Sequence, residues 1–153
     1  MKKIVVISDT HGNISLIEKL LPIINESDYL IHLGDGIKDL VPFMRDIKAE
    51  TIWVYGNCDG GGEDKIIEID GLKILLTHGD RHGVKNSLYA LHARAKEEQV
   101  SVVFYGHTHV YSIIEEEGVT LINPGSLNDF LERSYCYAVI YGGKITAKIV
   151  PIR

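Results

Sequence analysis

Short apolar runs alternate with amphipathic stretches along this chain of 153 residues. Apolar runs of four or five residues, bounded by glycine or polar residues, are typical of buried strands. They predict strands at residues 4–7, 29–33, 51–55 and 101–105. Apolar residues spaced three or four apart predict helices at 14–24, 37–47 and 86–98. Asn13 is a suitable N-cap for the first helix, and Pro22 is expected to kink or end it near Leu21.

The remaining pattern is rich in strands. Residues 66–69 and 72–76 flank Asp70-Gly71, which is a strong hairpin signal. Further strands are predicted at 111–116, 119–122, 135–141 and 144–150, with Gly142-Gly143 as a tight turn between the last two. The pattern indicates an α/β chain with enough mixed strands for two sheets and helices packed outside them.

The composition fits a single domain over residues 1–153, with 45% hydrophobic and 24% charged residues. The net charge of -5 argues against a broad basic surface, so we expect no stable nucleic-acid complex. Two distant cysteines suit a reducing compartment. The first apolar run is too short for a signal peptide, and no segment reaches the length of a membrane span. We therefore expect a soluble, cytoplasmic protein.

Five predicted strands end in the same kind of loop, which carries glycine together with Asp, Asn or His. The loops read SDTHG at 8–12, GDG at 34–36, GNCD at 56–59, THGD at 77–80 and GHTH at 106–109. Ligands of α/β sheets bind at the carboxyl ends of the strands, so these loops are expected to converge. Glycine lets the backbone turn sharply and approach a bound group closely.

The convergent polar set is Asp9, His11, Asp35, Asn57, His78, His107 and His109. Taken singly, each histidine suits a structural role, and Asp9 and Asp35 suit helix caps. Together they offer more ligands than a tetrahedral structural zinc site uses. They suit two divalent ions about 3.5–4 Å apart, which activate water and clamp a phosphoryl group. His107 and His109 are then expected to serve different ions.

In this order, the five motifs resemble those of the calcineurin-like metallophosphoesterases. The resemblance extends from Asp9 to the NPGS loop at 123–126 and is closest to the small YfcE-like phosphodiesterases, which share GNCD and NPGS. It implies a four-layer αββα sandwich with a dinuclear metal centre between the sheet edges. It also implies a metal-dependent phosphodiesterase.

The resemblance implies that Asp9, His11 and His109 bind one metal, that Asn57, His78 and His107 bind the other, and that Asp35 bridges both beside a hydroxide. It favours two Mn²⁺ ions, while Zn²⁺, Fe²⁺, Co²⁺ or Ni²⁺ also suit the mixed ligands. The expected reaction is in-line attack on phosphorus by the bridging hydroxide. Asp35, Asn57 and His107 are the expected catalytic residues, and Asn57 is also placed to touch the substrate phosphate. Resemblance and base rates favour a homodimer.

The sequence departs from the superfamily pattern at Cys58. Many relatives have histidine there, which is thought to protonate the leaving oxygen, and a thiol of pKa about 8.5 is a poorer acid. Three explanations remain: a good leaving group, donation by another residue such as His82, or donation by water. Asp80 is another departure, since it is often histidine in similar sequences. Asp59 is expected to support the ligands from a second shell.

Two other functions stay open. A phosphomonoesterase or protein phosphatase would use the same metals, but the usual acid is missing at Cys58. A non-catalytic metal-binding scaffold is the other, because some members of the superfamily keep the fold without the activity. Scaffolds usually lose ligands, whereas every ligand position is filled here, so the sequence favours the enzyme.

Substitution Cys58→His tests the leaving-group hypothesis. We expect it to raise the hydrolysis rate of phosphate esters with poor leaving groups more than that of nitrophenyl esters, because only poor leaving groups need a proton. Steady-state rates on both ester classes measure the difference. Equal effects on the two classes would contradict the hypothesis.

Overall fold

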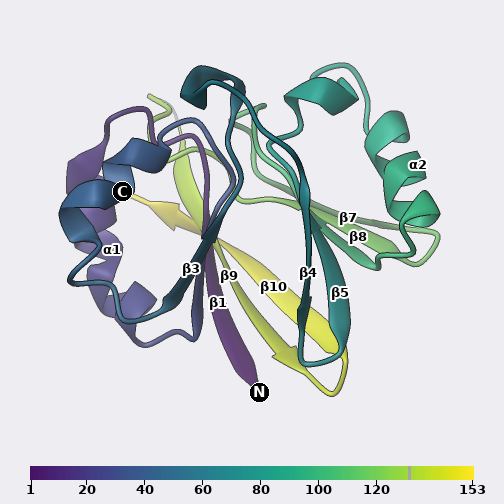
Figure 1. Cartoon of the computed structure of the whole chain (residues 1–153), viewed down its shortest axis with the longest axis horizontal. Coiled ribbons are helices and arrows are strands. Elements are labelled where there is room, and N and C mark those ends of the chain that lie inside the picture. Colours follow the sequence, from purple (N-terminus) through teal and green to yellow (C-terminus); the bar gives the residue numbers. More distant parts are fainter. Residues whose placement is uncertain (131) are drawn as a thin grey trace.

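The computed structural model describes residues 1–130 and 132–153, which form two five-stranded sheets (Figure 1). The first sheet has the order β10-β9-β1-β2-β3. Its strands are β1 (Lys2–Ile7), β2 (Tyr29–His32), β3 (Glu50–Trp53), β9 (Arg133–Tyr141) and β10 (Lys144–Ile152). Strands β1, β2 and β3 are parallel, while β9 is antiparallel to both β1 and β10.

The second sheet has the order β4-β5-β6-β8-β7. Its strands are β4 (Lys65–Ile69), β5 (Leu72–Leu76), β6 (Val102–Phe104), β7 (Ser112–Glu116) and β8 (Val119–Asn123). Strands β5, β6 and β8 are parallel, and β4 and β7 are antiparallel edges. Both sheets are therefore mixed.

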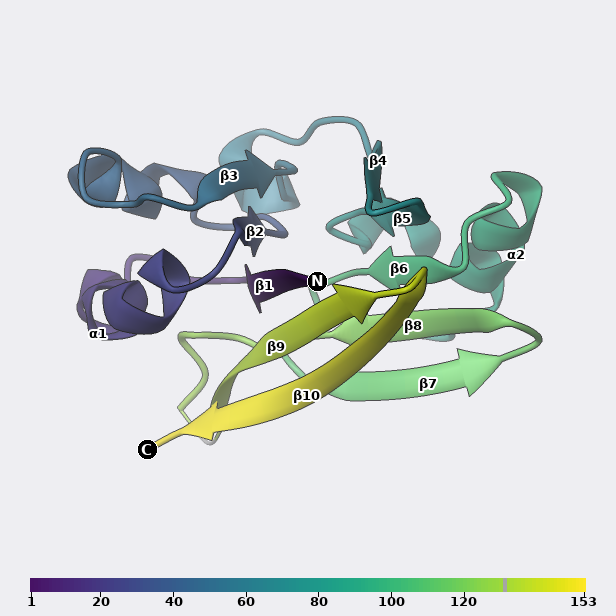
Figure 2. The same cartoon turned by 90° about the horizontal axis from the view of Figure 1, so that it is seen from below.

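Helices cover the outer faces of the sheets. Helix α1 (Ile14–Asn25) and the 3₁₀ helix η1 (Ile37–Phe43) lie against the first sheet, and α2 (Tyr89–Glu97) lies against the second (Figures 1 and 2). One apolar core fills the space between the sheets, and one lies under each helical layer. The four-layer αββα sandwich is confirmed.

Strand β1 shows why the inner strands are continuous apolar runs. Ile4 and Val6 point into the core between the sheets, whereas Val5 and Ile7 point under α1. All four side chains are fully buried. A strand that is buried on both faces does not alternate apolar and polar residues but forms a continuous apolar run. Such a run predicted the strand at residues 4–7.

Several local predictions are confirmed. The Asn13 side chain caps α1 by accepting a hydrogen bond from the Leu16 N–H at 3.4 Å. Strands β4 and β5 pair through a turn at Asp70 and Gly71, both with positive φ, as a type I′ turn requires.

Three helix predictions are corrected. Helix α1 does not end near Leu21 but continues through the exposed Pro22 to Asn25, although this proline removes one backbone hydrogen bond of the helix. Residues 37–47 do not form an α-helix; the 3₁₀ helix η1 covers only Ile37–Phe43 and contains Pro42. Proline lacks the N–H that a longer α-helix would need there. Helix α2 also begins later than predicted, at Tyr89.

The carboxyl ends of the parallel strands of both sheets lie at one edge of the sandwich, at the top of Figure 1. Backbone hydrogen bonds join the loops there: the N–H of Asp9 donates to the Gly34 carbonyl at 2.9 Å, and that of Gly106 donates to the His78 carbonyl at 3.0 Å. The His107 N–H donates to Asp9 Oδ2 at 3.1 Å and links the two sheets. The motif loops are therefore brought together by the fold.

The Asp59 carboxylate holds the loops after β2 and β3 in place. It accepts hydrogen bonds from the N–H groups of Asp35 (2.6 Å), Gly36 (2.9 Å) and Gly56 (2.9 Å), with a longer one from Ile37 (3.3 Å). Partial burial alone would raise the pKa of Asp59, but these donors together hold the pKa below its ordinary value.

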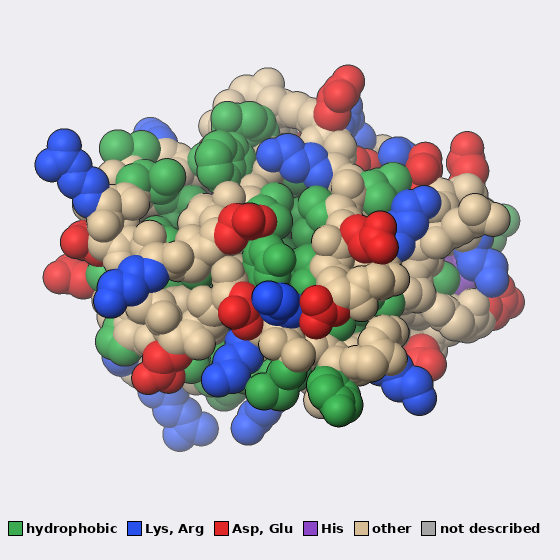
Figure 3. All heavy atoms as spheres, turned by 60° about the horizontal axis from the view of Figure 1, so that its bottom comes forward, with side chains coloured by type: hydrophobic (Ala, Val, Ile, Leu, Met, Phe, Trp, Pro, Cys, Tyr) green, Lys and Arg blue, Asp and Glu red, His purple; other side chains and the backbone are tan. Residues whose placement is uncertain are grey.

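The face opposite this edge shows interspersed acidic, basic and hydrophobic side chains (Figure 3). No broad basic area covers the described residues of that face. Neither α-helix in the described part of the chain is long and apolar enough to cross a membrane.

Substitution Asp59→Asn is expected to lower the free energy of unfolding by about 2 kcal/mol. The amide keeps one acceptor and turns its own N–H₂ group toward backbone donors, so several of the four hydrogen bonds are lost. Urea denaturation measures the change. Asp46 is exposed, so Asp46→Asn is the matched control and should change the free energy of unfolding by less than about 0.5 kcal/mol. Equal effects of the two substitutions would contradict the stabilising role of the four hydrogen bonds to Asp59.

Candidate metal centre

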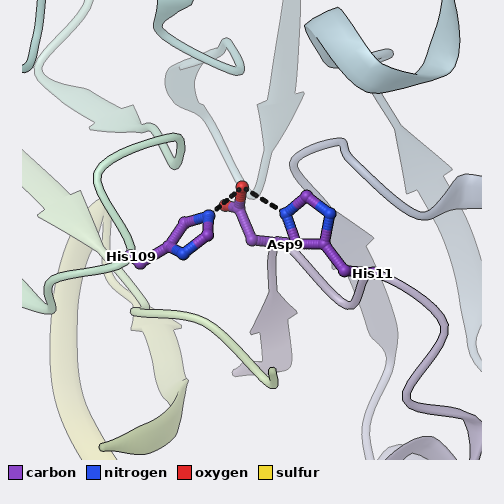
Figure 4. A group of neighbouring side chains, drawn as sticks. All are labelled: Asp9, His11 and His109. Carbon is purple, nitrogen blue, oxygen red and sulfur yellow. Dashed lines mark ion pairs between the residues drawn. The ribbon is translucent and has the colours of Figure 1, made fainter. Parts of the chain in front are cut away.

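The first group of convergent side chains is Asp9, His11 and His109 (Figure 4). Asp9 and His11 follow β1 in the first sheet, and His109 follows β6 in the second. Asp9 Oδ1 lies 3.2 Å from His109 Nε2 and 3.6 Å from His11 Nε2. Two sheets thus contribute to one group of candidate ligand atoms.

The charges in this group act on one another. Burial alone would raise the pKa of Asp9, but the imidazoles of His109 and His11 hold it far below its usual range. In return, the Asp9 carboxylate raises the pKa values of His11 and His109. The buried carboxylate is thus ionised and stabilises neighbouring positive charge.

The second group is Asp35, His78 and His107. The Nδ1 of His78 lies 2.7 Å from the Leu33 carbonyl oxygen, which only accepts, so Nδ1 carries the hydrogen. The Nε2 of His78 is therefore the nitrogen that faces the other members of the group, 3.2 Å from Asp35 Oδ2 and 3.2 Å from His107 Nδ1. A backbone carbonyl that fixes the tautomer in this way is typical of metal-binding histidines.

These atoms fit divalent cations. Asp9 Oδ1 is buried and makes no hydrogen bond of good geometry with any residue in the described ranges. His78 Nε2 and Asp35 Oδ2 face each other at 3.2 Å, so a cation or a proton between them would satisfy both atoms. Imidazole and carboxylate ligands suit Zn²⁺, Mn²⁺, Fe²⁺ and Co²⁺.

The backbone at the two groups is strained. Asp9, His11, Asp35, His107 and His109 all have φ between 41° and 69°, in the left-handed region that non-glycine residues rarely adopt. Such strain costs about 1–3 kcal/mol a residue and is concentrated at functional sites. The strain points to these loops independently of the residue types.

Glycines let the loops approach one another. A Cβ on Gly56 would collide with the Asp35 side chain, and one on Gly106 would collide with Ser8 Oγ and lie 2.8 Å from Asp9 Oδ2. No side chain fits at either position, so both glycines are needed for the backbone of one loop to pass the carboxylate of another.

The remaining expected ligand, Asn57, begins the 3₁₀ helix η2 (Asn57–Asp59) and is exposed. Its amide nitrogen lies 3.8 Å from Cys58 Sγ, and the Cys58 N–H donates to Asp35 Oδ1 at 2.8 Å. Desolvation and the negative charge of Asp35 raise the pKa of the Cys58 thiol. The ligand role of Asn57 stays a prediction.

A pocket of about 280 Å³ opens beside the two groups and includes one residue of each, His11 and Asp35. Its other lining residues are Gly12, Gly36, Lys38, Cys58 and Asp59. His82, the expected candidate donor, instead lies 2.7 Å from Asp64 and lines a separate pocket with Arg81 and Arg94. The Asp59 carboxylate binds the backbone N–H groups of Asp35 and Gly56, and its second-shell role stays a prediction.

The sequence did not reveal a buried network behind the centre. The Gly34 N–H donates to His32 Nδ1 at 3.0 Å, so His32 Nε2 donates to Thr10 Oγ1 at 3.1 Å. Thr10 in turn donates to Asp39 Oδ2 at 2.6 Å. Burial lowers the pKa of His32 to about 4, so its ring is neutral. In the sequence, the apolar residues beside His32 and Asp39 indicate only that these two side chains are buried.

The sequence of this chain is similar to those of known proteins over most of its length. It is 34% identical over 146 residues to the probable metallophosphoesterase YsnB of Bacillus subtilis, covering 90% of this chain and 82% of that protein. It is 33% identical over 149 residues to the phosphodiesterase MJ0936 of Methanocaldococcus jannaschii, covering 84% and 86%. The phosphodiesterase YfcE of Escherichia coli K12 is 28% identical over 156 residues, covering 84% and 80%.

The fold is also found in a solved structure of Vps29 from Chaetomium thermophilum, at a TM-score of 0.81 and 20% identity, covering 100% of this chain and 87% of that one. That likeness concerns the fold alone. A family model for the calcineurin-like phosphoesterase superfamily domain matches residues 1–142. The strand-end motifs, the sandwich and these relatives agree, and the chain belongs to the calcineurin-like phosphoesterase superfamily.

Proposed function

We propose that this chain is a phosphodiesterase that works with two divalent metal ions, Mn²⁺ being the activating ion. The observation that carries the proposal is the convergence of Asp9, His11 and His109 beside Asp35, His78 and His107, each group within reach of one cation. The names of the relatives MJ0936 and YfcE support diester substrates.

The ligand assignment follows the two groups. Asp9, His11 and His109 would hold one ion, His78, His107 and Asn57 the other, and Asp35 would bridge them. Asp35 suits the bridge because its Oδ2 lies 3.8 Å from His11 Nε2 and 3.2 Å from His78 Nε2, one histidine from each group. When bound, the two ions would supply hydroxide at neutral pH and neutralise charge on the phosphoryl oxygens.

The protein's own residues orient and support these ligands. The Leu33 carbonyl fixes the ring of His78, and the Cys58 N–H fixes one oxygen of Asp35. Lys38 lines the open pocket and would offset the negative charge of a bound phosphodiester. The open pocket suits an esterase of loose specificity.

This site has no good proton donor for the leaving group at the position where relatives have one. The Cys58 thiol is the side chain at the usual acid position, and its raised pKa makes it a poor donor. Diesters with good leaving groups do not need that proton. This favours a phosphodiesterase over a phosphomonoesterase or protein phosphatase, and the filled ligand set favours it over a scaffold.

Free cysteines and the composition support a cytoplasmic, single-domain protein, and the homodimer stays a prediction.

Hydrolysis of bis-p-nitrophenyl phosphate and p-nitrophenyl phosphate tests the function. We expect protein reconstituted with Mn²⁺ to cleave the diester and to cleave the monoester only slowly, and we expect a chelator to abolish both activities. No cleavage of either ester with Mn²⁺, Zn²⁺, Fe²⁺, Co²⁺ or Ni²⁺ would contradict the proposal.

The variant His107→Asn sharpens this test. Because loss of a partner behind a metal ligand already costs about 10–100-fold, loss of the ligand itself should reduce diester cleavage by about 100-fold or more. The matched control is His92→Asn, since His92 lies on α2, outside both groups, with its Nε2 3.0 Å from the carbonyl oxygen of Glu116 in β7. Its activity should stay within about twofold of the unmodified chain.

A further inference from the structure

A third group of candidate metal-ligand atoms lines the pocket beside the first two groups. Cys58 Sγ, a ring nitrogen of His11 and a carboxylate oxygen of Asp35 all lie within 4.8 Å of one another. The three residues come from the loops after β3, β1 and β2 and line the same pocket. One divalent cation bonded to all three would hold their ligand atoms about 3–4 Å apart.

The surroundings of this group attract a cation. Asp9 Oδ1, which is fully buried and lacks a well-formed hydrogen bond among the described residues, lies 3.6 Å from His11 Nε2. Asp9 and Asp35 thus bring two carboxylates beside His11. An unpartnered buried oxygen is costly unless an ion satisfies it.

The backbone of Cys58 is fixed, while its side chain is exposed. Its N–H donates to Asp35 Oδ1 at 2.8 Å, so residue 58 is tied directly to the expected bridging carboxylate. The exposed thiol lines the pocket, with its sulfur 3.8 Å from the amide nitrogen of Asn57. The other cysteine, Cys136, is fully buried in the core between the sheets and does not line the pocket.

We propose that Cys58 is itself a metal ligand, which joins His11 and Asp35 and biases the centre toward thiophilic divalent cations such as Zn²⁺ and Cd²⁺ relative to Mn²⁺. The proposal rests on the proposed function, because it uses the same metal centre. On binding, the S–H bond breaks, the proton goes to solvent and an S–metal bond forms, with no change of oxidation state. Nitrogen, oxygen and sulfur sites already bind Zn²⁺ more tightly than Mn²⁺, and a thiolate widens the difference.

Addition of Co²⁺ to the metal-free chain tests the bond directly. We expect the near-ultraviolet charge-transfer band of a cobalt–thiolate bond, together with the visible bands of Co²⁺ held by histidine and carboxylate. The variant Cys58→Ser should lose only the charge-transfer band, since it keeps the N–H that binds Asp35. The variant Cys136→Ala should keep both sets of bands.

Affinity provides a second readout. We expect Cys58→Ser to weaken Zn²⁺ and Cd²⁺ binding by about tenfold or more, and to leave Mn²⁺ binding within about twofold, as measured by calorimetry. Visible cobalt bands without a charge-transfer band in the unmodified chain would overturn the role of Cys58 and leave the metal centre intact. A charge-transfer band that persists in Cys58→Ser would overturn it too. Absence of any Co²⁺ binding would overturn both this proposal and the metal-dependent function.

Discussion

The crowding of buried carboxylate and imidazole atoms at the top of the sandwich is the constraint on which the rest of this structure depends. Asp9 Oδ1 is buried without a well-formed hydrogen bond within the described chain, and His78 Nε2 faces Asp35 Oδ2 at 3.2 Å. Such a cluster is unfavourable without cations. Five of the residues involved are also held in left-handed backbone conformations. The apolar cores on both faces of each sheet stabilise the fold and offset the free-energy cost of this strain and crowding.

Each of the first two groups of candidate ligands contains residues from both sheets. Asp9, His11 and Asp35 come from the first sheet, and His78, His107 and His109 come from the second. Cations bound there would join the two halves of the sandwich as well as supply chemistry, and metal affinity would then be thermodynamically linked to the packing of the sheets. The hydrogen bond from the His107 N–H to Asp9 Oδ2 provides part of this link through the protein alone.

The sequence predicted the inner strands well, because strands buried on both faces are read from short apolar runs without regard to distant contacts. It also placed the motif loops correctly, since parallel strands end at a common edge. It failed where a contact between distant residues decides the outcome. Three of the four hydrogen bonds to the Asp59 carboxylate join residues that are 22 to 24 positions apart in the sequence. The hydrogen bond from Thr10 to Asp39 joins residues 29 positions apart. The pairing of His82 with Asp64 likewise has no local signal.

Anomalous diffraction from crystals grown with Mn²⁺, recorded on either side of the manganese absorption edge, tests the central claim most directly. The account predicts two manganese peaks, one among Asp9, His11 and His109 and the other among Asp35, His78 and His107. A single peak, or peaks away from these residues, would contradict it.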